Sequence, residues 1–201
     1  MTFAGWHRAA LCTIAALLLA GGALAQTSDG VDEAKVKAAF LLRFGQFVVW
    51  PREVLPQADT PLVIGVAGAD DVAAELSRQA ATGRAAPGRR VAVRNLRAGQ
   101  EVPAVHVLFV GADEAGRIAQ YAAAIRGRGI LLVTESPGAL EHGSMINFVV
   151  ADRRVKFEIA LEPAEKAGLA LSSRLLAVAL RVLKGELSPV DAADQRIARG
   201  F

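Results

Sequence analysis

Short apolar runs that alternate with helical stretches constrain the fold of this chain more than any other feature. Each run is rich in branched residues and is bounded by turn-forming residues, which is typical of a buried strand. The runs span residues 61–68, 91–96, 104–111 and 129–135. Between them, Asp70 or Asp71 is suited to cap a helix through "VAAELSRQA", and Asp113 opens a second helix that reaches residue 125. The alternation predicts an α/β sheet flanked by helices.

The spacing of apolar residues changes further along the chain. In "MINFVV" and "VKFEIAL", at residues 145–150 and 155–161, apolar and polar residues alternate, which predicts an antiparallel hairpin joined across "ADRR". A helical stripe then predicts a long last helix that is covered on most sides, and this stripe consists of Leu171, Leu175, Val178 and Val182. We therefore expect one domain over residues 26–190, built as a mixed β-sheet with flanking helices in three layers. Residues 191–201 are expected to form a loosely ordered tail.

The stretch "VKAAFLLRFGQFVVWP", residues 36–51, places its aromatic residues at helical spacing. Pro51 ends the helix because a proline disfavours the helical conformation of the residue before it. Such a stretch suits a membrane anchor, a core helix or a surface for another protein. We expect its aromatic face to lie mainly in the core; this face consists of Phe40, Phe44 and Phe47.

The first 25 residues have a different character. A short segment with one Arg and one His precedes an apolar run, and the small residues Ala23 and Ala25 then mark a cleavage site. The run is broken by Gly21 and Gly22 and falls short of the roughly 20 residues that a spanning helix needs. We expect a secretory signal peptide that is cleaved after Ala25 rather than an anchor.

Cleavage changes the charge and the cysteine content of the chain. The chain loses one of its 23 basic residues, so that 22 remain against 20 acidic ones and the net charge is +2. This balance does not indicate a nucleic-acid-binding protein. The single cysteine, Cys12, lies in the leader, so the mature protein has no disulfide although its compartment is oxidising. With no second apolar run long enough to span a bilayer, we expect a soluble protein of the periplasm.

Residues that carry chemistry are few. The mature chain keeps His106 in a predicted strand and His142 in a loop, which does not make a metal site. Ser144 lacks the G-x-S-x-G pattern of a serine nucleophile, and Ser172 or Ser173 is better explained as a helix cap. We therefore expect no enzymatic activity, no metal and no cofactor.

Arginines crowd one predicted loop and the strand after it. They suit either a solvated edge that resists aggregation or a docking patch for an acidic partner or for anionic headgroups. Their spacing alone does not separate these alternatives. The five residues are Arg84, Arg89, Arg90, Arg94 and Arg97.

Four stretches of the chain, taken in order, resemble the YfiR family of periplasmic proteins. The first is residues 36–51, which ends in Trp-Pro, and the second is "PLVIGVAGADDVAAEL" at residues 61–76. The third and fourth are residues 130–161 and "AGLALSSRLLAVALRV" at residues 167–182. The resemblance covers nearly the whole mature chain.

This resemblance implies a regulator. In the family's best-known role, the protein binds the periplasmic sensor domain of an inner-membrane diguanylate cyclase and holds it inactive, which lowers cyclic di-GMP and biofilm formation. The family fold is a mixed α/β sheet with flanking helices, and its members are homodimers. Relatives carry disulfides that respond to redox state, whereas this mature chain has no cysteine, so its release must follow another route.

The contact residues that we expect are polar or amphipathic positions within the matched stretches: Arg43, Trp50, Asn147, Ser173 and Arg174. We expect Arg43 and Trp50 to be exposed. Each position also has a structural explanation, such as a helix-end plug for Trp50 and a cap for Ser173. The partner alternatives include another membrane receptor such as a histidine kinase.

Two other classes of function remain open. A periplasmic small-ligand sensor would use the loops at strand ends near Gly68 and Glu135. The turn at Gly68 does not have the G-x-G-x-x-G pattern of a dinucleotide site. A hydrolase would depend on His106 and His142, because the mature chain has no other histidine.

Overall fold

The computed structural model describes residues 26–56, 59–82 and 89–185. The predicted signal peptide, its cleavage after Ala25 and the predicted tail therefore lie outside the described residues. Contacts divide the chain into two units, Met1–Glu33 and Ala34–Phe201. Of the first unit the structure describes only the start of helix α2 (Gln26–Phe47), and the architecture below is that of the second unit.

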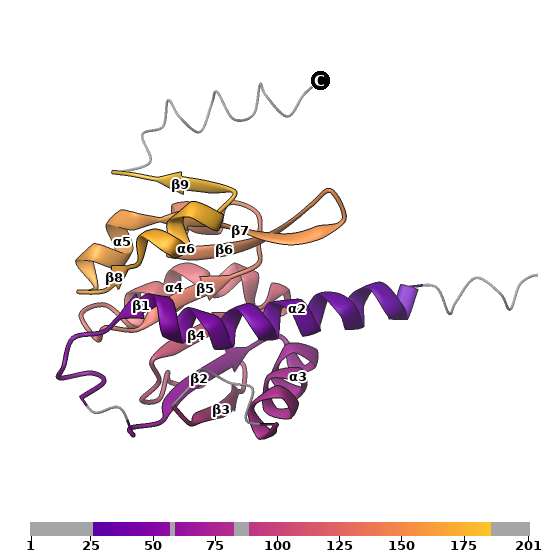
Figure 1. Ribbon diagram of the computed structural model, residues 1–201, viewed down its shortest axis with the longest axis horizontal. Helices are drawn as coiled ribbons and strands as arrows, with labels where there is room; N and C mark the ends of the chain where they lie inside the picture. The colour runs from indigo at the N-terminus through magenta and orange to yellow at the C-terminus, as the bar shows by residue number, and fades with distance from the viewer. Residues whose placement is uncertain (1–25, 57–58, 83–88, 186–201) are drawn as a thin grey trace, which may run out of the picture. The chain divides into compact units, whose positions relative to one another are not determined.

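Within the described residues, seven strands form one mixed sheet in the order β3-β2-β4-β5-β6-β7-β9 (Figure 1). The strands β3, β2, β4, β5 and β6 are parallel to one another, β7 is antiparallel to β6, and β9 is parallel to β7. The mixed sheet expected from the sequence is confirmed. The strands are β2 (Leu62–Ala67), β3 (Val91–Leu96), β4 (Val107–Val110), β5 (Leu131–Thr134), β6 (Ile146–Ala151), β7 (Arg154–Ala160) and β9 (Arg181–Leu183).

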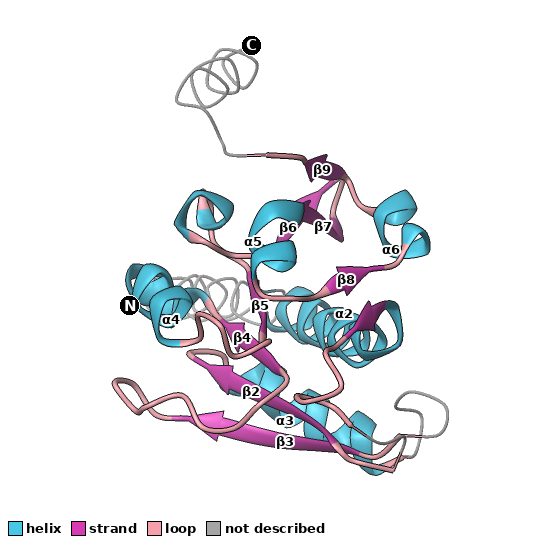
Figure 2. Cartoon of the chain, turned by 90° about the vertical axis from the view of Figure 1, so that its left-hand side faces the viewer, coloured by secondary structure: helices cyan, strands magenta, loops and turns pink. Residues whose placement is uncertain are grey.

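Helices lie on both sides of this sheet. Figure 2 shows α4 on one side of the strands and α2 on the other. Helix α3 is joined to α2, because the Gln79 amide donates to the Lys35 carbonyl oxygen at 3.1 Å. The remaining elements are α3 (Asp70–Ala81), η1 (Ala112–Arg117), α4 (Ile118–Ala124), η2 (Ala139–His142), α5 (Leu161–Lys166), α6 (Ser173–Val178) and the paired short strands β1 (Val48–Val49) and β8 (Ala170–Leu171).

An aromatic cluster packs α2 on the antiparallel end of the sheet. Phe148 on β6 and Phe157 on β7 face each other in register, so their rings share one face of the sheet. Phe44 stacks on Phe148 at 5.9 Å between ring centroids, and Phe40 meets Phe157 edge-on at 5.4 Å. Phe47 is half-buried and also packs against the core. The prediction that the aromatic face of this helix lies mainly in the core is confirmed.

The hairpin predicted across "ADRR" is also present. Ala151 pairs with Arg154, which leaves a two-residue turn made by Asp152 and Arg153. Both have positive φ angles, 54° and 56°, as a tight hairpin turn requires. The alternation of apolar and polar residues does not extend fully to burial, because Phe157 and Ile159 are buried on one face but Glu158 on the opposite face is buried as well.

The predicted long last helix is wrong. Its stripe residues belong to separate elements: Leu171 ends β8, Leu175 and Val178 lie in α6, and Val182 lies in β9. Helix α6 ends at Ala179, which has an extended backbone, because the next residues satisfy their hydrogen bonds on β7. The Leu180 N–H donates to the Phe157 carbonyl at 2.8 Å. The end of the helically spaced stripe, at Val182, therefore forms the edge strand β9.

The predicted cap of α3 is wrong too. Ala69 occupies the N-cap position and makes no side-chain cap. The Asp70 carboxylate instead accepts from the Asn95 amide on β3 at 2.6 Å, and Asp71 accepts from the neighbouring Val72 N–H at 2.8 Å. Tertiary pairing with β3 therefore competes successfully with local capping.

Replacing Phe157 by Ala tests the aromatic cluster. The substitution removes a fully buried ring and leaves a cavity, so we expect the free energy of unfolding to fall by about 3–5 kcal/mol in a urea titration. The control is Val150→Ala on the same hairpin, where the side chain is 59% exposed and the expected change is below about 1 kcal/mol. Equal losses in both variants would contradict the assignment of the cluster as the main packing contact of the hairpin.

Candidate functional site

The end of α2 and the start of α6 meet, although they are far apart in sequence. Val48 pairs with Leu171 and Val49 with Ala170 in the two-stranded β1–β8 sheet. The Ser172 N–H then donates to the Phe47 carbonyl at 2.8 Å, which gives the last turn of α2 a partner for its free carbonyl group. The first and last stretches of the family resemblance are thereby hydrogen-bonded to each other.

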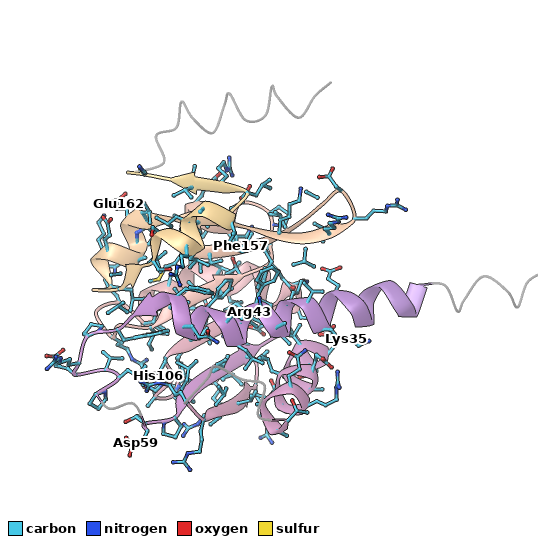
Figure 3. All side chains as sticks on the ribbon, viewed as in Figure 1. Lys35, Arg43, Asp59, His106, Phe157 and Glu162 are labelled. Carbon is cyan, nitrogen blue, oxygen red and sulfur yellow. The ribbon has the colours of Figure 1, made fainter. Side chains whose placement is uncertain are left out.

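Three of the five expected contact residues lie on these joined elements and are exposed: Arg43 on α2, which Figure 3 labels, and Ser173 and Arg174 at the start of α6. Two exposed apolar side chains accompany them, Val49 at 65% and Val178 at 68%. We name these five residues the α2–α6 surface. Exposed arginines together with exposed apolar side chains are a composition found at protein-binding surfaces.

The position of Ser173 follows from the cap of α6. The Ser172 hydroxyl accepts from the Leu175 N–H at 3.3 Å and so caps the helix. Of the two serines that the sequence offered as caps, the structure uses Ser172. Ser173 is the first helical residue and its side chain is exposed, so it is available for contact.

The expected exposure of Trp50 is wrong. Its side chain is only 7% exposed, because the chain turns at Pro51 directly after β1 and keeps the ring in the core. The turn is closed by the Val54 and Leu55 N–H groups, which both donate to the Pro51 carbonyl. The indole Nε1 of Trp50 finds no acceptor within the described part of the chain. Trp50 plugs the end of the helix rather than presenting a contact.

Asn147 lies inside the protein, with 2% of its surface exposed. Its side-chain oxygen accepts from the Thr134 hydroxyl at 2.7 Å, and the Ser144 hydroxyl lies 2.8 Å from that of Thr134. Asn147 is therefore remote from solvent in this conformation. Its place is in the sheet rather than on the α2–α6 surface.

Asn147 belongs to a polar row that crosses four strands. Thr134, Asn147, Glu158 and Arg181 are register partners on β5, β6, β7 and β9, and so share one face of the sheet. At the edge, the Arg181 guanidinium donates to the buried Glu158 carboxylate at 3.0 Å. The row fixes the register of the last strands, because a shift by one residue would leave these buried groups without partners. The alternating pattern assigned Glu158 to a polar face but did not indicate its burial.

The strand ends proposed for a small-ligand sensor are filled by the chain itself. In this sheet β3 is added on one side of β2 and β4 on the other, so the strand order reverses between β2 and β4. Ligands of open α/β sheets bind at such a point. There the Gly111 N–H donates to the Ala67 carbonyl at 2.8 Å, and a Cβ on Gly111 would lie 2.2 Å from the Gly68 carbonyl oxygen. Gly68 has φ +66°, and a Cβ on it would lie 2.7 Å from the Glu114 Cγ. Backbone packs directly on backbone at this point.

Glu135, the other residue proposed for that sensor, is also engaged. Its carboxylate accepts from the Ala112 N–H at 2.8 Å and forms an ion pair with Lys37 on α2. Both side chains of the ion pair are 11% exposed. The pair connects the helix to the end of β5, and it occupies the donor and acceptor groups that a ligand would use.

His106 has a structural role. Its Nδ1 accepts from the Val63 N–H at 2.9 Å and its Nε2 lies 3.2 Å from the Val54 carbonyl oxygen. This arrangement requires a neutral ring with the proton on Nε2. Burial lowers the pKa of His106 below 6.5, the nearby Arg89 charge lowers it further, and the hydrogen bond to Val54 opposes both. A histidine with both ring nitrogens bonded to backbone is not free to act as the base of a hydrolase.

His142 lies in η2 and is exposed. Among the described residues, no group of three or more His, Cys, Asp or Glu side chains is arranged to hold a metal ion. No helix in the same residues has both the length and the apolar character that crossing a membrane requires.

Comparison with known proteins places the chain in context. A family model described as YfiR/HmsC-like matches residues 34–180. Comparison with curated proteins gives no significant match. Of the solved structures that are similar, a conserved domain protein from Vibrio cholerae O1 biovar eltor has 14% identity and a TM-score of 0.48, with 66% of this chain and 57% of that chain covered.

A second solved structure is an ABC domain in complex with L-Trp from Streptococcus pneumonia. It has 11% identity and a TM-score of 0.44, and the match covers 60% of this chain and 55% of that chain. This chain thus spans little more than half the length of either protein.

Replacing His106 by Asn tests its structural role through pH. Because the folded-state pKa of His106 is lowered, its contribution to stability is present above about pH 6.5 and is lost as the pH falls through the folded-state pKa. We expect the wild-type melting temperature to fall more steeply than that of His106→Asn between about pH 7.5 and about pH 5. The Asn side chain can still accept from Val63.

The matched control for this pH series is His142→Asn. Its melting temperature should follow the wild-type pH profile, since the His142 ring is exposed. If His106→Asn keeps the wild-type pH slope, the buried ring is not the group that titrates.

Proposed function

Because the chain belongs to the YfiR/HmsC-like family, we propose that it is a non-enzymatic periplasmic regulator of a membrane-bound diguanylate cyclase. In this proposal it binds the periplasmic sensor domain of the cyclase and represses it, which lowers cyclic di-GMP and biofilm formation. The observation that carries the proposal is the family match, which extends over residues 34–180 and so includes both elements of the α2–α6 surface.

The α2–α6 surface is the part of the chain that we propose to contact the partner. It combines the guanidinium groups of Arg43 and Arg174 with the exposed Val49 and Val178. Arginine beside apolar groups is enriched at protein interfaces, where it forms charged hydrogen bonds around a dry centre. Ser173 supplies a hydroxyl at the same place. Trp50 and Asn147 are not part of this surface.

The proposed mechanism requires no chemistry. A folded domain that binds the inactive arrangement of its partner more tightly than the active one shifts the population of the partner by the difference in affinity. The groups that could have carried chemistry support this reading, because His106 and Glu135 are bonded to other parts of the chain. The homodimer that the family resemblance implies stays a prediction, which analytical ultracentrifugation checks.

The test of the proposed function is the level of cyclic di-GMP in cells that lack the gene. We expect deletion to raise cyclic di-GMP, and we expect the full chain to restore the original level while a chain lacking residues 1–25 does not. An unchanged level after deletion would remove the cyclase as the target. Restoration by the chain without residues 1–25 would remove the periplasm as the site of action.

The test of the surface is the double variant Arg43→Glu/Arg174→Glu, measured for binding to the purified periplasmic domain of the cyclase. Reversing two charges at a protein interface should raise the dissociation constant by about tenfold or more. The matched control is Arg153→Glu/Arg154→Glu on the hairpin, which makes the same change of charge at two exposed residues. Equal weakening in both variants would show that net charge rather than this surface determines binding.

A further inference from the structure

The most basic part of the chain includes the strand at one edge of the sheet. Residues 76–100 contain six arginines and no aspartate or glutamate. Strand β3, in the middle of this segment, pairs only with β2 and forms one end of the seven-stranded sheet, which Figure 1 shows below β2. The arginines within β3 and next to it therefore lie along a sheet edge.

Three of these arginines are exposed and have no acceptor among the described residues: Arg90 just before β3, Arg94 within it and Arg97 just after it. We name them the β3 edge arginines. Other arginines of the segment differ, since Arg78 forms an ion pair with Glu75 and Arg89 donates to the Thr60 carbonyl at 2.7 Å. Among the described residues, no carboxylate forms an ion pair with the side chains of the β3 edge arginines.

One carboxylate of the structure is bonded to this edge strand. Asp70 at the start of α3 accepts from the Asn95 amide of β3 at 2.6 Å. The chain after the edge is held in place as well, because the Arg128 guanidinium donates to the Val102 and Pro103 carbonyls at 3.1 and 2.9 Å. The strand is therefore tied to α3, and the chain that follows it is tied to Arg128.

The edge lacks the features of a protein interface. Among the described residues, the exposed large hydrophobic side chains all lie outside residues 89–100. They are Val36, Val49, Val150, Val178 and Leu180. Protein interfaces have an apolar or aromatic centre that supplies most of the binding energy. Arginines without such a centre fit a surface of phosphate groups, which the planar guanidinium binds through two parallel hydrogen bonds.

We propose that the β3 edge arginines dock the protein on an anionic phospholipid surface. The proposal rests on the periplasmic location in the proposed function, where the protein faces the outer leaflet of the inner membrane, but not on the cyclase as partner. Strand β9, which follows α6, lies at the opposite end of the sheet. Six strand spacings separate β3 from β9 in the sheet order, so the two edges are about 29 Å apart.

The test is cosedimentation of the purified full-length protein with vesicles, without any partner present. We expect binding to vesicles with about one third phosphatidylglycerol in phosphatidylcholine, and no binding to pure phosphatidylcholine. Binding should weaken as salt rises from about 0.03 M to about 0.3 M, because exposed charges are screened. The variant Arg94→Glu/Arg97→Glu should lower the partition coefficient by about tenfold or more.

The matched control is again Arg153→Glu/Arg154→Glu, which should bind vesicles as the wild type does. The melting temperatures of both variants are measured and should equal that of the wild type, so that loss of folding is not mistaken for loss of binding. Absence of vesicle binding at low salt, or equal loss in both variants, overturns the proposal. A third result also overturns it: if Arg94→Glu/Arg97→Glu binds vesicles normally but loses the cyclase domain, the edge contacts an acidic protein surface instead.

The outcome of this experiment is separate from that of the test of the proposed function. Vesicle binding is measured without the cyclase, and cyclic di-GMP is measured in cells that contain it. Normal repression by a protein that does not bind vesicles would leave the regulator intact and remove the lipid contact. Vesicle binding by a protein whose deletion leaves cyclic di-GMP unchanged would keep the lipid contact and remove the cyclase regulator.

Discussion

The packing of α2 on the β6–β7 hairpin is the contact on which the rest of the structure depends. Phe44 and Phe40 bury their rings against Phe148 and Phe157, so a helix near the start of the chain is fixed to strands more than 100 residues later. Large aromatic side chains bury more apolar surface than any other kind, and residues 26–201 contain no cysteine with which to form a disulfide. This packing also positions β1, which follows α2, so that it pairs with β8. Strand β8 then leads into α6.

The same packing explains why the candidate surface lies where it does. Once α2 is seated, β1 pairs with β8 and the Ser172 N–H reaches the Phe47 carbonyl, so Arg43 and Arg174 come from elements that are joined. The strand ends that serve as ligand sites in other α/β sheets are closed by Gly111 against Gly68. A rigid domain of this kind is suited to binding another macromolecule through its exterior. The β3 edge has no exposed large apolar side chain, whereas the α2–α6 surface includes Val49 and Val178 as well as its two arginines.

The candidate site could be predicted from the sequence only in part. Arg43, Ser173 and Arg174 are polar residues next to apolar stripes, and the structure does expose them. Trp50 and Asn147 could not be placed in this way, because their burial depends on residues distant in sequence. Asn147 is buried because Thr134 and Glu158 lie beside it on neighbouring strands, and a strand pattern shows which residues alternate but not which strand lies alongside.

The sequence by itself determined the α/β class, the boundaries of strands such as residues 91–96, the hairpin across Asp152 and Arg153, and the aromatic core face of α2. These features follow from local periodicity and turn chemistry, which act within a few residues. Only the tertiary structure decided that the last apolar stripe divides into β8, α6 and β9. A helical spacing of Leu and Val is compatible with a strand when a neighbouring edge, here that of β7, offers hydrogen bonds and burial. That competition is settled by contacts between distant residues, which no local pattern contains.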